Sequence, residues 1–373
     1  MKTVLQLCQN YHQPFLDCTR QYAALFSGSD YRVVTVFICG EAQDDVRQKA
    51  AADEVIFLEH HRDELDGLKR HILREIRSIS EQYDFSVCIA HRNKATYLAL
   101  MGTDLPVFSI HHAFGDFDRI GRRLLSRYYQ KRLTFFAVSN AVRADIHNKL
   151  PFWPTDKLHT LYNRIDTSTL SQQSLEREQA RDLLGLAQDS YVIAYGGRLH
   201  PDKDQSTLIR AFARARTELP ALSTLVIVGT GKDQRKLQHL CEQLGITSDV
   251  IFTGMVPDAK KAFRAFDLFV LSSDHEPFGM VLLEAMVAGV PVICSDSGGG
   301  PEVIEGIGSI FATGDAQALA ASMVSAANTE QHHEDRLRVS ERLQLFSDEQ
   351  ARKTFWSIPS VRQLLGEAST GSV

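Results

Sequence analysis

The sequence has few of the features that mark secreted, membrane-spanning or disulfide-stapled proteins. Its six cysteines are scattered and none stands in CxxC spacing, which argues against both a zinc motif and a disulfide framework. Residues 1–8 carry one lysine and a short apolar run, far short of a signal-peptide core or a membrane span. No low-complexity tract or short repeat occurs either. We therefore expect a globular protein of the reducing cytoplasm whose first residues form a β-strand.

The length and composition suit two ordinary domains. The chain has 373 residues, of which 44% are hydrophobic and 23% charged, so large apolar cores can form. The net charge of -5 hides an asymmetry: residues 1–165 carry 22 Lys/Arg and 19 Asp/Glu, and the rest carry 19 and 27. A mildly basic first half is compatible with an anionic acceptor or membrane surface. We expect no nucleic-acid partner.

Short runs of Val, Ile and Phe alternate with segments of helical period, the pattern of repeated βαβ units. The runs lack strict period-two alternation, as expected for parallel strands buried on both faces. The predicted strands of the first half are 4–8, 33–38, 55–58, 87–90, 107–110 and 135–138. The pattern restarts with predicted strands at 191–195, 225–228, 250–252, 268–271 and 290–293.

The restart predicts two doubly wound units in tandem. The segment 161–166 leads into a polar stretch, 167–179, which we interpret as the crossing between domains. The first domain then covers residues 1–165, and the second covers 166–345. The segment 348–365 has helical spacing with Phe355 and Trp356 on it, so we expect residues 346–373 to return to the first domain.

Two segments of the second half carry candidate binding residues. In GGRLHPDKD, residues 196–204, a glycine pair and two cations, Arg198 and Lys203, follow a predicted strand. Ligands bind open α/β sheets at such strand ends, and this composition suits a diphosphate. In residues 274–280, Pro and Gly precede a helix predicted at 281–288, whose first N–H groups form an anion site. Glu276 stands before that helix and Glu284 within it, where they can meet hydroxyl groups.

Four motifs in this order resemble the retaining glycosyltransferases of family four. They are GGRLHPDKD, VGTGKDQRKL, HEPFGMVLLEAMVAGVPVI with Glu276-x7-Glu284, and SGGGPEVI, all between residues 190 and 320. The resemblance implies an α/β fold of the GT-B type, in which two doubly wound Rossmann-like domains face each other across a cleft. It implies transfer of a sugar from a nucleotide-sugar donor to a glycan or glycolipid acceptor, with retained anomeric configuration. Members of this kind commonly build bacterial surface polysaccharide or lipopolysaccharide.

The resemblance also assigns roles in the second half. Arg198 and Lys203 would offset charge on the departing nucleotide, and Glu284 would hold the ribose hydroxyls. Glu276, together with Phe278, Gly279 and Met280, would hold the donor sugar. The segment 254–256, with Val256, would rest against the base of a UDP- or GDP-sugar, and Gly197 is a further expected donor-binding residue. No cofactor and no divalent metal are expected, since the cations and the helix terminus supply the positive field.

The first half matches the family less closely. The strand 107–110 ends in His111 and His112, and the resemblance implies that one of the two faces the reaction centre. The linker 163–166 has Arg164 where the family has glycine. The first strand-to-helix turn, 9–14, lacks the usual Gly-Gly pair, and His12 is a possible side-chain substitute there.

Other functions fit parts of the pattern. A glycoside hydrolase could use Glu276 and Glu284 as paired carboxylates, although such pairs normally come from separate strands. A nucleotide-sugar epimerase would use the same donor contacts without an acceptor. An inactive GT-B subunit that binds a nucleotide or a partner enzyme would need no catalytic residues at all.

A basic amphipathic helix is predicted at 119–132. On a helical wheel Ile120, Leu124, Leu125, Tyr128 and Tyr129 share one side, and Arg119, Arg122, Arg123 and Arg127 share the other. If the apolar side packs on the sheet, the arginines are simply solvated. The same pattern also suits peripheral contact with an anionic membrane at the inner face of the cytoplasmic membrane.

Overall fold

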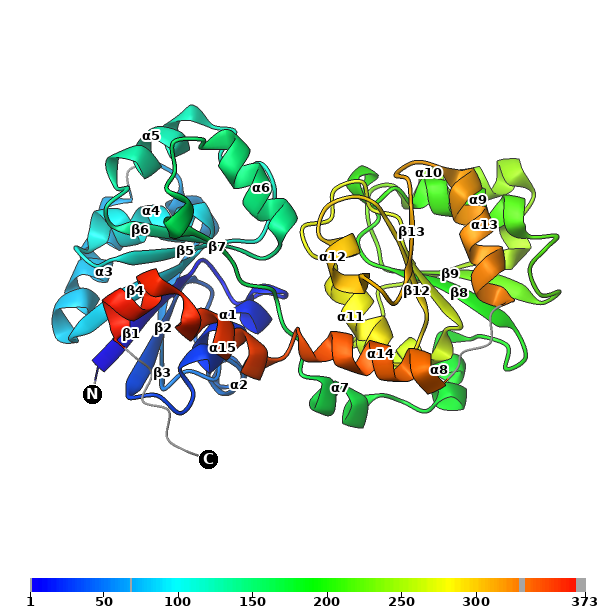
Figure 1. The fold of residues 1–373 in the computed structure, drawn as a ribbon, viewed down its shortest axis with the longest axis horizontal. Coiled ribbons are helices and arrows are strands. Elements are labelled where there is room, and N and C mark those ends of the chain that lie inside the picture. The colour runs from blue at the N-terminus through cyan, green and yellow to red at the C-terminus, as the bar shows by residue number, and fades with distance from the viewer. Residues whose placement is uncertain (1, 68, 329–332, 367–373) are drawn as a thin grey trace. The chain divides into compact units, whose positions relative to one another are not determined.

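A computed structural model describes residues 2–67, 69–328 and 333–366, which form two compact units (Figure 1). The first unit runs to Arg164 and resumes at Asp348, and the second comprises Ile165–Ser347. The sequence had suggested crossings after residues 165 and 345. The polar stretch 167–179 lies in the second unit and contains helical segments, because Asp166 caps a helix there by accepting from the N–H of Thr169.

The first unit is built on a parallel sheet with the order β3-β2-β1-β4-β5-β6-β7. Its central strands are almost wholly buried on both faces, which explains their continuous apolar sequence. All six strands predicted in this half are present. The three-residue edge strand β7 was not predicted. The strands are β1 (Lys2–Cys8), β2 (Tyr31–Cys39), β3 (Glu54–His60), β4 (Phe85–His91), β5 (Val107–His111), β6 (Leu133–Ala137) and β7 (Leu158–Thr160).

Helices connect these strands, and two more come from the end of the chain. The α-helices are α1 (Phe15–Ala23), α2 (Asp44–Lys49), α3 (Arg70–Gln82), α4 (Arg92–Gly102), α5 (Ile120–Tyr128), α6 (Asn140–Lys149), α15 (Asp348–Ser357) and α16 (Pro359–Leu365). The 3-10 helices are η1 (Ala24–Phe26), η2 (Arg62–Leu65) and η3 (Thr155–Lys157).

The C-terminal helices α15 and α16 complete the core of the first unit, as predicted (Figure 1). Phe355 packs edge-on against Phe26 and Phe108, with ring centroids 5.6 and 6.0 Å away. The indole N–H of Trp356 donates to the Leu25 carbonyl at 2.9 Å. Without these helices, one face of the sheet would lose its aromatic cover.

Arg164, at the end of the first pass through this unit, is buried to 2% exposure. Its Nε donates to Asp348 Oδ1 at 2.9 Å, and its backbone N–H donates to Gln21 Oε1 at 3.0 Å. A glycine could keep the backbone contact with Gln21 but could not pair with Asp348. The arginine in the linker therefore ties α15 to the body of the first unit.

The second unit has a parallel sheet with the order β10-β9-β8-β11-β12-β13. The five predicted strands are present, although β12 begins at Val292 and not at residue 290 as predicted. The three-residue edge strand β13 was not predicted. The strands are β8 (Tyr191–Gly196), β9 (Ser223–Val228), β10 (Val250–Gly254), β11 (Leu268–Leu271), β12 (Val292–Ser295) and β13 (Ser309–Phe311).

The helices of the second unit follow the same alternation. The α-helices are α7 (Thr167–Gln173), α8 (Arg177–Leu184), α9 (Gln205–Ala215), α10 (Gln234–Leu244), α11 (Met280–Val287), α12 (Gly300–Ile304), α13 (Ala316–Ala327) and α14 (His333–Gln344). The 3-10 helices are η4 (Pro201–Lys203), η5 (Thr247–Asp249) and η6 (Ala259–Ala265). Among the residues described, no helix has both the length and the apolarity that a membrane span requires.

The orientation of α5 differs from the interpretation in which its apolar side packs on the sheet. Ile120, Leu124 and Tyr128 are 74%, 61% and 81% exposed, so this part of the apolar side does not pack on the sheet. Instead Arg122 donates to the Asp116 carbonyl at 2.8 Å, and Arg123 donates to the Phe117 carbonyl at 2.5 Å. Two of the four arginines thus hold the helix to the protein, and its apolar ridge points outward.

Candidate functional site

The glycine pair Gly196-Gly197 ends strand β8 and begins the loop that carries Arg198. The Arg198 side chain is 61% exposed and its guanidinium lies 3.1 Å from Asp202 Oδ2. Asp202 also contacts the ring of His200, and η4 then leads to Lys203. Arg198 is thus a solvent-facing cation, lightly held at the carboxyl end of the central strand.

Lys203, in contrast, is already paired. Its Nζ lies 2.7 Å from Glu276 Oε2, and the two side chains are only 18% and 13% exposed. The Ser273 hydroxyl donates to the same carboxylate oxygen at 3.2 Å. The structure therefore joins two predicted site residues, from loops that follow β8 and β11, into one half-buried ion pair.

A pocket of about 180 Å³ lies at the carboxyl ends of β8, β9 and β10, which is more than a buried water requires. Three predicted donor-site residues, Gly197, Val256 and Glu284, line it. Gly229, from the motif VGTGKDQRKL, and Lys260 also line it, although the sequence had assigned neither residue a role. The other lining residues are Leu184, Gly196, Val228, Met255, Ala259, Phe263, Phe266 and Val281.

Two glycines in the predicted motifs are required by close backbone contacts. A Cβ at Gly229, in VGTGK, would lie 2.0 Å from the Gly197 carbonyl oxygen, at a φ of +129°. A Cβ at Gly298, in SGGG, would lie 1.9 Å from the Glu276 carbonyl oxygen, at a φ of +66°. Both positions therefore exclude side chains, and both set the loops that carry the candidate site.

Helix α11 begins directly after Gly279, whose φ is +98°. The first N–H groups of a helix have no carbonyl acceptors within the helix, so the N-terminus of α11 offers hydrogen-bond donors to an anion. Phe278 is 2% exposed and packs edge-on against Phe346, with ring centroids 5.7 Å apart. Its side chain anchors the loop, while Glu284, one turn further on in α11, reaches the pocket.

In the first unit, the two histidines at the end of β5 have different surroundings. His111 is 1% exposed, its Nδ1 lies 2.7 Å from Asp116 Oδ2, and its Nε2 lies 3.0 Å from the Ser109 hydroxyl. His112 is only partly buried, and its ring is stacked on that of His91. Both nitrogens of His111 are thus occupied within the protein.

The ring of His112 bridges two elements of the first unit. Its Nε2 lies 3.3 Å from His91 Nδ1, at the end of β4, and its Nδ1 lies 3.8 Å from Cys18 Sγ in α1. Desolvation, with the nearby His111 and Arg92, lowers the pKa of His112 to about 3. This imidazole is neutral at physiological pH. In the 9–14 turn, Tyr11 is buried, while His12 is exposed.

Two Asp-x-Asp spacings occur, and both are used for internal contacts. In 116–118, Asp116 accepts from Asn93 at 2.6 Å as well as contacting His111, and Asp118 pairs with Lys149 at 2.6 Å. In 202–204, Asp204 caps α9 through the N–H of Thr207 at 3.3 Å. These carboxylates do not converge: among the residues described, the single cluster of three metal-ligand side chains lies elsewhere, at His60, Glu64 and His71.

Comparison with known proteins agrees with this geometry. Residues 176–344, nearly the whole second unit, match the family described as glycosyl transferases group 1. The resemblance predicted from the four motifs is therefore confirmed.

Curated relatives cover only part of the chain. An uncharacterised glycosyltransferase of Methanocaldococcus jannaschii is 37% identical over 41% of this chain and 40% of its own length. The N-acetyl-alpha-D-glucosaminyl L-malate synthase of Bacillus anthracis is 28% identical over 63% and 58%. The chain thus aligns with about half the length of these curated relatives.

Solved structures extend the likeness to the whole fold. Anabaena HepE, solved in complex with UDP and glucose, has a TM-score of 0.75 at 19% identity and covers 96% of this chain and 99% of its own. A glycosyltransferase from Rickettsia africae has a TM-score of 0.79 at 15% identity, covering 100% and 99%. The predicted GT-B fold class, with two Rossmann-like units, is confirmed.

Proposed function

We propose that the protein is a retaining glycosyltransferase that moves a sugar from a UDP- or GDP-sugar to a glycan or glycolipid acceptor. The observation that carries the proposal is the pocket of the second unit, which is lined by Gly197, Val256 and Glu284 beside an exposed arginine. A group 1 family match over the same residues, and a structural neighbour solved with UDP and glucose, support it.

We assign the roles by the positions of the side chains. Val256 and Met255 offer an apolar surface for the base, and Glu284 offers a carboxylate for the ribose hydroxyls. Arg198 and the start of α11 supply positive charge for the diphosphate. Lys203, which is paired with Glu276, would stabilise the negative charge of the leaving phosphate. Glu276 would accept hydrogen bonds from hydroxyl groups of the donor sugar.

The residues of the first unit enter the proposal through the acceptor side. His112 is the better candidate for a reacting group, since its ring nitrogens have longer contacts, 3.3 Å to His91 and 3.8 Å to Cys18, than the 3.0 and 2.7 Å contacts that hold the ring of His111. His111 then positions the turn that follows β5. The proposed product belongs to bacterial surface polysaccharide or lipopolysaccharide synthesis.

The donor site is tested by Arg198→Ala, which is suited to the purpose because the side chain is exposed and its loss leaves no buried charge. We expect transfer to fall by about two orders of magnitude or more, comparable with losing one preorganised donor to a developing charge. Arg210→Ala, at an exposed arginine of α9, is the matched control. Equal turnover in both variants would remove the diphosphate assignment.

The reaction type is tested independently. Saturation-transfer NMR against UDP-, GDP- and ADP-sugars identifies the donor, and proton coupling constants then give the anomeric configuration of the product. We expect retention and full activity in EDTA, because protein cations supply the positive field. An inverted product would contradict the retaining mechanism, and donor turnover without an acceptor would favour an epimerase.

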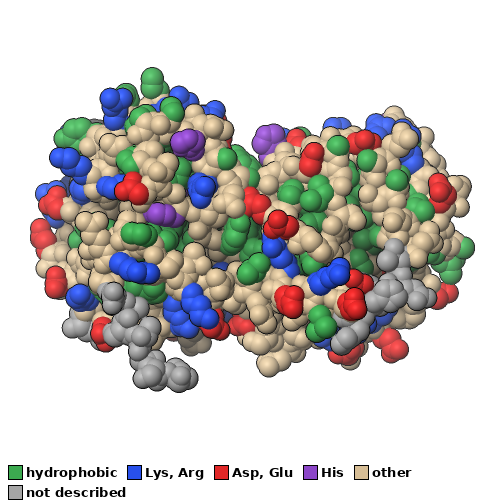
Figure 2. Space-filling view, viewed as in Figure 1, with side chains coloured by type: hydrophobic (Ala, Val, Ile, Leu, Met, Phe, Trp, Pro, Cys, Tyr) green, Lys and Arg blue, Asp and Glu red, His purple; other side chains and the backbone are tan. Residues whose placement is uncertain are grey.

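The exposed apolar side chains of α5 support a proposal about where in the cell the protein acts. Ile120, Leu124 and Tyr128 recur at intervals of four along one line of the helix, and exposed Arg119 and Arg127 flank them. In Figure 2, blue and green side chains lie together over the part of the first unit where Figure 1 labels α5. We infer peripheral contact with anionic lipid at the inner face of the cytoplasmic membrane, at about 1 kcal/mol per basic residue.

Co-sedimentation with phosphatidylglycerol liposomes tests this contact. The ridge variant Leu124→Ser/Tyr128→Ser and the charge variant Arg119→Glu/Arg127→Glu should both bind less than the parent protein. The difference between the charge variant and the parent should vanish at high salt. Leu183→Ser, at a 59% exposed leucine of α8, is the matched control. Binding by both ridge and charge variants at the level of the parent would leave α5 as an ordinary surface helix.

A further inference from the structure

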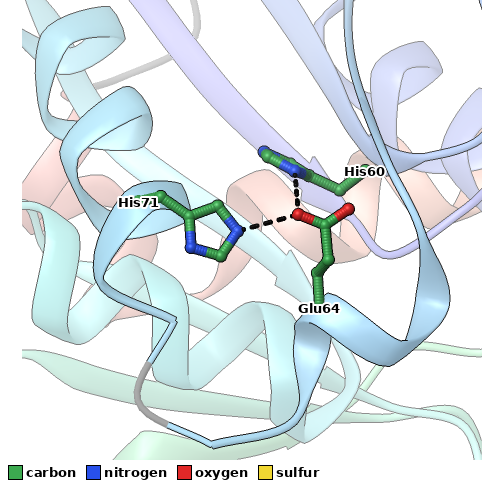
Figure 3. A group of neighbouring side chains, drawn as sticks. All are labelled: His60, Glu64 and His71. Carbon is green, nitrogen blue, oxygen red and sulfur yellow. Dashed lines mark hydrogen bonds and ion pairs between the residues drawn. The ribbon is translucent and has the colours of Figure 1, made fainter.

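Four side chains come together at the carboxyl end of β3, the edge strand of the first sheet. His60 ends β3, Glu64 lies in η2, and His71 and Glu75 lie one turn apart at the start of α3. Figure 3 shows the rings of His60 and His71 directed at one carboxylate oxygen of Glu64. His60 Nδ1 lies 3.2 Å and His71 Nε2 lies 3.1 Å from Glu64 Oε2.

The carboxylate at the centre is fixed from behind. Glu64 Oε1 accepts from the backbone N–H of His61 at 2.8 Å, in a capping box at the start of η2. That hydrogen bond fixes the carboxylate so that Glu64 Oε2 is oriented toward the two imidazoles.

His60 is fixed from behind in the same way. Its Nε2 lies 2.9 Å from Glu75 Oε2, on the side of the ring away from Glu64. Both nitrogens of His60 face carboxylates, so hydrogen bonds to both carboxylates would require the doubly protonated, charged ring. If a metal ion binds Nδ1 instead, the ring can be neutral, and its single N–H, at Nε2, donates to Glu75. This carboxylate–histidine–metal arrangement is typical of protein metal sites.

The spacing fits a small tetrahedral ion. Zinc binds imidazole nitrogen and carboxylate oxygen at about 2.0–2.1 Å, so two ligand atoms of a tetrahedron lie about 3.3 Å apart. The observed separations of 3.2 and 3.1 Å are close to that length. One ligand atom from each of the three residues lies within 4.8 Å of the others, and the half-exposed ring of His71 can close the third edge.

We propose that the first unit binds a zinc ion through His60 Nδ1, Glu64 Oε2 and His71 Nε2, with Glu75 as the residue that positions His60. The side chains are 11%, 39% and 45% exposed, so water can take the fourth position. Two nitrogen ligands favour zinc over magnesium, which prefers an all-oxygen shell. The ion would join the end of β3 to the start of α3. The site is separate from the residues proposed for sugar transfer.

Zinc titration of the metal-free full chain, in competition with a chromophoric chelator, tests the proposal. We expect one tight site per chain that magnesium does not occupy. His71→Ala and Glu64→Gln should each weaken it at least 100-fold, and Glu75→Gln should weaken it about 10- to 100-fold as an outer partner. The six cysteines are all buried, so thiols do not compete.

His239→Ala is the matched control, because His239 forms an exposed pair with Glu242 at 3.1 Å and is far along the chain from β3. Cobalt bound in place of zinc should give the visible absorption of a tetrahedral site, retained in Glu75→Gln and lost in His71→Ala. Tryptophan fluorescence checks that each variant is folded. Absence of a tight site, or equal affinity in His71→Ala, Glu64→Gln and the control, would overturn the proposal whatever the outcome of the transfer assays.

Discussion

The ion pair between Lys203 and Glu276 allows stability and catalysis to be separated. At 2.7 Å the Coulomb attraction is about 6 kcal/mol for an effective dielectric constant of 20, and removing the two ions from water costs several kcal/mol each. The net contribution of the intact pair is therefore small. Removing one partner is different, because the other charge then stays in a half-buried place without its counter-ion, and of the two residues it is Glu276 that keeps the Ser273 hydroxyl.

We expect Lys203→Met and Glu276→Gln each to lower the free energy of unfolding by about 2 kcal/mol, somewhat less than the ~3–5 kcal/mol of a fully buried pair. The double variant should lose only about 1 kcal/mol, which gives a coupling energy of about 3 kcal/mol. Transfer should instead fall by two orders of magnitude or more in all three, since none retains both groups at the proposed donor site.

The two tryptophans make the measurement specific. Trp153 and Trp356 both lie in the first unit, so fluorescence reports its unfolding, while circular dichroism reports both units. The urea transition seen by fluorescence should be unchanged in all three variants. A double variant whose loss equals the sum of the single losses would refute the coupling, and a double variant with restored transfer would refute the donor role.

Three further predictions concern other parts of the chain. Gly298→Ala should displace the Glu276 loop and lower transfer at least 10-fold. The control Gly306→Ala, where a Cβ meets nothing within 4 Å, should cost only the strain of a positive φ, about 1–2 kcal/mol of stability. Equal turnover of the two variants in a steady-state assay would contradict this. The pKa of His112 is about 3 in the folded chain and ordinarily 6.5, so the unfolded chain binds the extra proton. The stability of the first unit should therefore be complete above pH 6.5 and fall as the pH drops toward 3, and urea midpoints should fall less in His112→Asn. Phe355→Ala should destabilise the first unit by about 3–5 kcal/mol, with the fluorescence transition of Trp153 moving and the second unit unaffected in circular dichroism.

Much of the fold follows from local sequence. Strands buried on both faces must be apolar throughout, so β1 and β8 are visible as runs of Val, Ile and Leu. The edge strands β7 and β13 have three residues each, too few to produce a pattern. Their positions depend on backbone pairing with a neighbouring strand, β6 for β7 and β12 for β13.

The candidate site shows the same limit. The positions of Arg198 and Glu284 follow from a strand end and a helix start, which the sequence marks with glycine and proline. The pairing of Lys203 with Glu276 joins residues far apart in the chain, and no local pattern encodes it. For α5, a helical wheel gives the residues that share a side, but the carbonyls of Asp116 and Phe117 decide which side faces inward.

The route of the chain through Arg164 and Asp348 also bears on biosynthesis. These two residues are bonded at 2.9 Å in the first unit, and just beyond them Ile165 donates to the Phe346 carbonyl at 3.0 Å in the second. The second unit is thus an insertion whose two ends are held together, and its residues are all synthesised before Phe355 and Trp356. Domains usually fold in order from the N-terminus as they leave the ribosome. Here the strands made first must wait for the helices made last, so the inserted unit completes its core before the unit that precedes it.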